Sequence, residues 1–205
     1  MTAAPGLDFI GHPNGEWASL DGVPDEVAFA FDLANSRDER VFFPHSQRSD
    51  GRDLIRTRSE LEAWLRFRLP EIDAVTDEDL DLVRRGREAV RLIAAANTDP
   101  ARCDDARRAM RELSPELPLR FSVDEAGDIG IEGAGSGVRW FLASALARAV
   151  APSGREAWAR LKMCSAPDCH WVFYDHSKPR TGRWCSMAVC GNRVKSREYR
   201  RRRPG

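Results

Sequence analysis

The stretch Cys164-Ser-Ala-Pro-Asp-Cys169, followed fifteen residues later by Cys185-Ser-Met-Ala-Val-Cys190, contains four of the five cysteines of this 205-residue chain. The two cysteine pairs have the same internal spacing. A structural Zn²⁺ is bound by four thiolates in a tetrahedron, and two short Cys pairs supply them when a hairpin or a helix start brings the pairs together. We therefore predict one structural Zn²⁺ with Cys164, Cys169, Cys185 and Cys190 as its ligands.

Other interpretations of these cysteines are weaker. Two disulfides would need an oxidising compartment, and the first residues lack the basic region and apolar block of a secretory signal. A catalytic zinc needs an open coordination position, which four protein thiolates do not leave. His170 and His176 are alternative ligands, but four cysteines already complete the shell. We expect Cys103, the fifth cysteine, to be a free thiol on a helix.

The residues around the second cysteine pair resemble a known family. The string Arg183-Trp184-Cys185-Ser186-Met187, and the Gly191-Asn192-Arg193-x-Lys195 that follows the fourth cysteine, are similar to the CGNR zinc finger of bacterial regulators. A weaker similarity links residues 30–37, Ala-Phe-Asp-Leu-Ala-Asn-Ser-Arg, to the start of the mostly helical, stress-induced-regulator domain that precedes this finger in the family. Ser36 stands where the family usually has Thr. The resemblance implies a transcriptional regulator.

Charge is distributed unevenly along the chain. Residues 155–205 contain 13 Lys or Arg and 4 Asp or Glu, a formal charge of +9, whereas the remainder carries −9 and the whole chain is neutral. Concentrated positive charge attracts polyanions, and nucleic acid is the commonest polyanion inside cells. No apolar run approaches the length of a membrane span, so we expect a cytoplasmic protein that makes no membrane contact.

Apolar residues upstream of the cysteines recur mostly with helical periodicity. The predicted helices begin at residue 25, cover 59–69 after a Ser59/Glu62 capping box, and then cover 77–97, 100–113 and 138–150. An alternating pattern in 119–123 and 129–132 predicts a β-hairpin. The expected fold is mainly α with a small β-hairpin: a helical N-terminal domain (1–151), for ligand sensing or dimerisation, and a small treble-clef-like zinc finger (155–205).

Four smaller predictions concern single segments of the chain. The arginines at 84, 85, 87 and 91 are expected on a solvated face of the 77–97 helix, and residues 157–163 are expected to form a strand that enters the first cysteine pair. A short strand is expected at residues 17–20, and His45 is expected in an exposed loop.

Asp32, Asn35 and Arg37 are the polar residues of the first predicted helix and its end. They are candidates for the lining of a small-molecule effector pocket. The alternative is that Asp32 and Asn35 tie down a loop, because Asn and Asp readily bond neighbouring backbone groups.

The basic residues after the fourth cysteine have helical spacing. Arg193, Arg197, Arg200 and Arg201 stand at i, i+4, i+7 and i+8, which places four guanidinium groups along one face, and Lys195 flanks them. Arginine pairs with phosphate and with guanine edges in the major groove, so these five residues are the predicted contacts to duplex DNA. Arg193 has a second candidate role, which is to support the metal site. A frayed basic tail is the alternative to a recognition helix.

These observations predict a zinc-binding, DNA-binding transcriptional regulator that is associated with the nucleoid. An RNA- or ribosome-associated protein is the second hypothesis, with bases stacked on Trp171, Phe173, Tyr174 and Trp184. An enzyme with its chemistry around Asp32, Asn35 and His45 is the third. The chain lacks a phosphate loop, an HExxH motif and a Ser/His/Asp grouping, so we do not expect an enzyme. A homodimer is compatible with either binding function.

Overall fold

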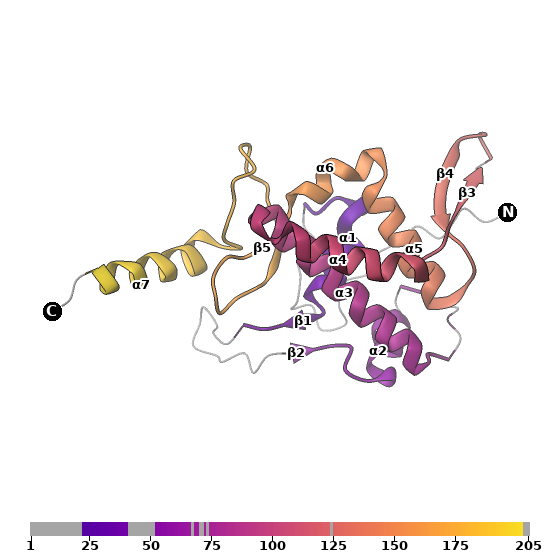
Figure 1. Ribbon diagram of the computed structural model, residues 1–205, viewed down its shortest axis with the longest axis horizontal. Coiled ribbons are helices and arrows are strands. Elements are labelled where there is room, and N and C mark those ends of the chain that lie inside the picture. Colours follow the sequence, from indigo (N-terminus) through magenta and orange to yellow (C-terminus); the bar gives the residue numbers. More distant parts are fainter. Residues whose placement is uncertain are drawn as a thin grey trace.

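The computed structural model describes residues 22–40, 52–66, 68–69, 72, 74–123 and 125–202. Helices dominate, and three two-stranded antiparallel sheets accompany them in this part of the chain. A helical body forms most of the molecule, and the C-terminal helix extends away from it (Figure 1). The expected strand at residues 17–20 and the loop position of His45 lie outside the described residues.

Two apolar helices form the centre of the body. Helix α1 (Asp25–Asn35) is buried along almost its whole length, and α5 (Gly137–Val150) packs beside it. The Phe29 ring meets the Phe141 ring of α5 edge to face, with 4.9 Å between the ring centroids. The apolar sequence of residues 138–150 therefore reflects a core position, since Phe141 and Leu142 are at most 2% exposed.

The long helix α3 (Asp77–Thr98) lies across this pair. Thr76 caps it with a complete capping box, in which Asp79 bonds back to the Thr76 backbone. Helix α2 (Arg58–Arg66) precedes it. The predicted capping box at Ser59 and Glu62 is wrong by two residues. The Thr57 hydroxyl accepts a bond from the Glu60 amide and donates one to the Glu60 carboxylate.

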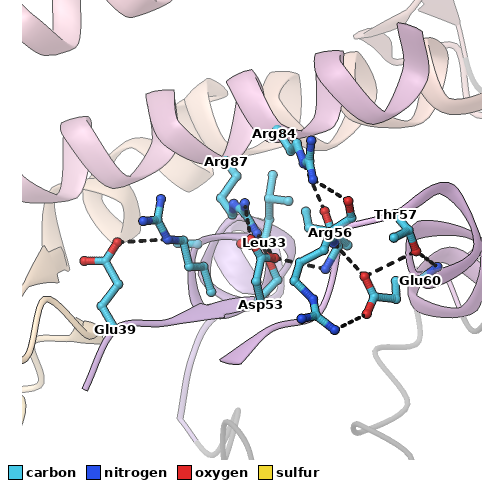
Figure 2. A network of polar contacts seen from close by, with 12 residues as sticks. Leu33, Glu39, Asp53, Arg56, Thr57, Glu60, Arg84 and Arg87 are labelled. Carbon is cyan, nitrogen blue, oxygen red and sulfur yellow. Dashed lines mark hydrogen bonds and ion pairs between the residues drawn. The ribbon is translucent and has the colours of Figure 1, made fainter. Parts of the chain in front are cut away.

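The arginines of α3 correct the prediction of a solvated face. Arg87 and Arg91 are 5% and 3% exposed. The reason is the short sheet of β1 (Arg37–Asp38) and β2 (Arg52–Asp53), which brings acceptors against α3. Arg87 donates two hydrogen bonds to the Asp53 carboxylate, at 2.6 and 3.0 Å (Figure 2). Arg91 donates to the carbonyl at the end of α1 and pairs with Glu39.

The Asp53–Arg87 pair leads to a pH prediction. Burial disfavours the carboxylate, but hydrogen bonds from Arg87 and the Ile55 amide outweigh it and lower the pKa of Asp53 below its ordinary value. A lowered pKa in the folded state adds stability above the ordinary pKa of about 4, and this is lost as the pH falls through the folded-state value. We expect Asp53→Asn to lower the free energy of unfolding at pH 7 by about 1–3 kcal/mol.

The check is urea unfolding of both proteins between pH 7 and pH 3, where the difference should narrow only below about pH 4. A difference that stays constant or grows on acidification would contradict the assigned role of Asp53. Asp104, whose side chain is 91% exposed beside Arg107, provides a control variant (Asp104→Asn) with little effect.

The remaining elements of the body follow the sequence closely. A 3₁₀ turn (Pro100–Arg102) leads into α4 (Cys103–Leu113), so Cys103 lies on a helix and is a free thiol. After a second 3₁₀ turn (Ser114–Glu116), β3 (Leu119–Val123) and β4 (Ile129–Gly133) form the predicted antiparallel hairpin. Among the described residues, no helix has the length and apolar character needed to cross a bilayer.

The chain reaches the cysteines by a different route from the one expected. Helix α6 (Pro152–Arg160) contains the first part of the predicted strand, and only β5 (Leu161–Met163) is extended. The expected boundary between the helical domain and the finger, at residues 151–155, falls in the first turn of α6. This helix packs on α5 and α1. Strand β6 (Val172–Tyr174) pairs with β5. A π-helical turn, η3 (Met187–Gly191), then leads into α7 (Asn192–Arg202).

Candidate metal centre and basic helix

The four cysteines of the two pairs meet in space. Their sulfur atoms all lie within 4.8 Å of one another. Two of the distances, Cys169 Sγ to Cys185 Sγ and Cys185 Sγ to Cys190 Sγ, are 3.6 Å. Sulfurs around a tetrahedral Zn²⁺ with Zn–S bonds of about 2.3 Å are about 3.8 Å apart. The spacing therefore fits one tetrahedral ion, and none of the four forms a disulfide.

The surroundings of the sulfurs also fit a metal. Cys164, Cys169 and Cys190 are at most 2% exposed, and Cys185 is half-buried. Hydrogen bonds from Cys169 and Cys185 lower the pKa of Cys164, while the bond to Cys164 raises the pKa of Cys169 well above its ordinary value. Without a cation the four sulfurs do not all ionise readily, because thiolates this close together repel one another. A divalent cation offsets this repulsion, and four thiolates leave it a structural role.

Local backbone geometry positions each cysteine. Cys164 directly follows β5, and its amide donates to the Trp171 carbonyl at 2.9 Å, which closes the first knuckle. In the second knuckle Ser186 acts as an N-cap, because its hydroxyl accepts a bond from the Val189 amide. The Cys190 amide then bonds to the Ser186 carbonyl, which turns Cys190 toward the other sulfurs.

A buried ion pair orders the loop between the two knuckles. Lys162 Nζ lies 3.0 Å from Asp175 Oδ2, and both side chains are at most 6% exposed. Lys162 also donates to the carbonyl of Arg180. The Asp175 carboxylate accepts bonds from the Ser177 and Gly182 amides at 3.0 and 2.8 Å. The pair therefore ties β5 and β6 to the chain that leads to Cys185.

The environment of Asp175 favours its charged form. Burial alone would raise its pKa, but the bonds from Ser177, Lys162 and Gly182 outweigh burial and lower the pKa of Asp175 to about 2. A Cβ atom at Gly182 would lie 2.8 Å from the Asp175 carboxyl carbon, so a larger residue there would displace this carboxylate. Sequence reasoning missed Asp175, because neither its spacing nor its type marks it as a partner of Lys162.

Asn35, a candidate effector contact, joins the helical body to the finger. Its side-chain amide donates to the Val172 carbonyl at 2.9 Å, and its oxygen accepts from the Val172 amide at 3.0 Å. Asn35 thus binds the backbone of β6 as a neighbouring strand would. Asn97 and Thr98 at the end of α3 add bonds to the backbone of α6 and β5. These contacts fix the finger on the body.

The other two candidate effector residues have different partners. Asp32 forms an ion pair with Arg68, and Arg37 pairs with Glu39 at 3.0 Å. Each of the three candidate effector side chains is thus bonded to a different partner within the chain. A separate cleft of about 270 Å³ lies between α3 and the first knuckle, and its lining includes Arg102, Arg183 and His170.

Asp168 connects the metal centre to the basic helix. This residue lies inside the first knuckle, and its two carboxylate oxygens accept bonds of 2.8 Å from Arg193 and Arg197. Arg193 Nη2 also lies 3.6 Å from the sulfur of Cys190. These contacts fit the supporting role that the sequence offered as one of two alternatives for Arg193. The only sequence signal for Asp168 is an acidic residue between two ligands.

The other predicted DNA contacts point into solvent. Lys195, Arg200 and Arg201 are all exposed, as is Arg202, and α7 has no buried residue. Figure 1 shows α7 (yellow) extending from the finger at one end of the long axis of the molecule. The metal centre and Asp168 hold its first turns, and its later turns lie clear of the body.

The aromatic residues of the finger are partly buried. Trp171, Phe173 and Trp184 pack around the buried cysteines, and Tyr174 packs against a small cluster with α1 and α6. The Arg40 guanidinium lies 4.0 Å from the centre of the Trp171 ring. These positions give the four aromatic residues a packing role in the core of the finger and at its base.

The fold and the centre together define a helical protein with a C-terminal Cys₄ zinc finger. Residues 160–203 match the family model described as CGNR zinc finger, so this part of the chain is a CGNR zinc finger. No curated protein matches the chain. The match includes all four cysteines and the Gly191-Asn192-Arg193 that follows them, and it confirms the predicted family of the finger and its single structural Zn²⁺.

Proposed function

We propose that this protein binds duplex DNA through α7 and acts as a transcriptional regulator associated with the nucleoid. The single observation that carries the proposal is the surface of α7. Six of its eleven residues are Lys or Arg and one is acidic, and none is buried. Such a helix neutralises phosphates and releases counterions from nucleic acid.

The anchoring of α7 supports recognition over a frayed tail. Like charges at i and i+4 repel one another and destabilise an isolated helix. Here Asp168 lies between Arg193 and Arg197 and compensates part of that repulsion. The η3 turn continues directly into α7, so the metal centre fixes its direction. A rigid helix is the usual means of presenting side chains to the major groove.

Two arginines are therefore assigned different roles from the rest. Arg193 and Arg197 position the helix through Asp168, and Lys195, Arg200 and Arg201 contact the phosphates and base edges. The cleft at Arg102 and Arg183 adds positive charge beside the first knuckle. We assign the finger a binding role and no catalytic residue. The role of the helical body in this proposal is to respond to a small-molecule effector.

Substituting Arg200 and Arg201 together with Ala tests the proposal. We expect binding to duplex DNA to weaken roughly tenfold to a hundredfold near physiological salt, and the slope of log K against log salt to fall by about 2, since each phosphate contact contributes about 0.9. The measurement is fluorescence anisotropy with a labelled duplex at several salt concentrations, beside a single-stranded RNA of equal length.

Arg107 and Arg108 on α4 provide the matched control, because both are exposed and pair only locally with Asp104 and Asp105. Their double Ala variant should bind DNA like the wild type, and all proteins should contain equal zinc. If both double variants lost affinity equally, the effect would come from the net charge of the protein and not from the surface of α7. Preference for the RNA would favour the second hypothesis.

A further inference from the structure

The β3–β4 hairpin presents an apolar face to solvent. Phe121, Val123 and Ile129 are 80%, 67% and 76% exposed, and Leu119 and Ile131 are 51% and 55% exposed. Side chains alternate between the faces of a strand. The register pairs Phe121 with Ile131 and Val123 with Ile129, so all five project from the same face of the hairpin.

The opposite face of the hairpin is polar. Arg120 lies across from Glu132 and forms an ion pair of 2.7 Å with it, and Ser122 lies across from Gly130. This alternation is typical of a sheet with one solvated face and one covered face. In the described structure the apolar face, whose composition is typical of a buried surface, is exposed to solvent.

The base of the hairpin is fixed to the body. The Gly133 amide donates to Ser144 of α5, and a Cβ atom at Gly133 would lie 2.3 Å from the Trp140 carbonyl. Strand β4 thus sits directly on α5 at this end, and Leu119 and Ile131, which lie nearer the base on their own strands, are less exposed than the other three apolar residues. The apolar face is held in a defined orientation.

We propose that this face is covered by the same face of a second copy of the chain. At the exposures given above, the five side chains present roughly 600 Å² of apolar surface, since a large side chain buries about 150–250 Å² in full. A monomeric protein rarely exposes a larger patch. Two copies related by a two-fold axis bury about 1,200 Å² there, which reaches the lower limit of specific interfaces.

The character of the face favours a copy of itself over an unlike partner. A two-fold interface places each patch against the same patch, so a patch with no charged residue meets no like charge. The five residues that project from it are all apolar. Figure 1 shows the hairpin and α7 at opposite ends of the long axis, so this dimer leaves both basic helices uncovered.

The test compares two lysine variants of neighbouring residues on one strand. Phe121→Lys places a charge on the apolar face, and Ser122→Lys places the same charge on the polar face. We expect sedimentation equilibrium of the full chain to give a dimer for the wild type and for Ser122→Lys. Phe121→Lys should weaken dimerisation at least about a hundredfold, because a central aromatic residue is lost from both copies.

Circular dichroism and zinc content show whether each variant is folded. If Phe121→Lys does not fold, Ile129→Lys serves as the second variant of the apolar face. A wild type that stays monomeric at high micromolar concentration would overturn the proposal, as would a dimer that both apolar-face variants leave intact. DNA affinity is recorded separately, so a failure of the dimer is distinguishable from a failure of DNA binding.

Discussion

Replacing Cys190 with Ser is expected to abolish stoichiometric zinc binding and to unfold the segment from Cys164 to Arg202. Cys190 is 0% exposed and its sulfur lies 3.6 Å from that of Cys185, so the substitution removes one of the four clustered thiolates. The small cluster around the cysteines contains few other buried residues. Its stability therefore comes from the metal, which contributes about 10–16 kcal/mol in structural zinc sites of isolated fingers.

The helical body is expected to stay folded in that variant. Its core is a cluster built mainly from α1, α3 and α5, and Val172 is the one residue of the unfolding segment that this cluster contains. The measurements are zinc content after purification under reducing conditions and limited proteolysis. Cleavage should be confined to the segment after Met163.

Cys103→Ser is the matched control, because Cys103 is a free thiol on α4 outside the metal centre. It should contain as much zinc as the wild type. The assignment of the ligands fails if Cys190→Ser keeps one zinc per chain, or if the wild type purified in this way contains no metal. Removal of the metal by a chelator should reproduce the proteolysis pattern of the Cys190 variant.

Asp175→Ala is expected to produce the largest loss among substitutions outside the metal ligands. It leaves the ammonium group of Lys162, which is 6% exposed, without its carboxylate partner, and it removes the acceptor of the Ser177 and Gly182 amides. Breaking a buried ion pair from one side typically costs about 3–5 kcal/mol. Urea unfolding of the zinc-loaded protein measures the loss.

A double variant separates the ion pair from simple packing. Lys162→Met combined with Asp175→Leu removes both charges, and apolar replacement of a whole buried pair is often nearly neutral. We expect this double variant to recover much of the stability that Asp175→Ala loses. If it is less stable than Asp175→Ala, the amide bonds to Asp175 matter more than its pairing with Lys162.

Local patterns in the sequence predicted much of this protein. The spacing of the two cysteine pairs identified the ligands, because a tetrahedral ion constrains a few residues at short separation. Apolar periodicity located the helices, and alternation located the hairpin, because each reflects one repeating backbone geometry. The Ser186 cap and the capping box at Thr76 are local in the same way.

The roles of individual polar residues were decided only by the tertiary structure. Arg87 resembles a surface residue in the sequence, yet Asp53 lies 34 positions away and makes its burial favourable. Asn35 binds a strand 137 positions away.

Asp168 distinguishes Arg193 and Arg197, with which it pairs, from the other basic residues of α7. A periodic pattern states which side chains share a face. Only packing brings distant donors and acceptors within about 3 Å, the distance over which a hydrogen bond can pair a buried charge.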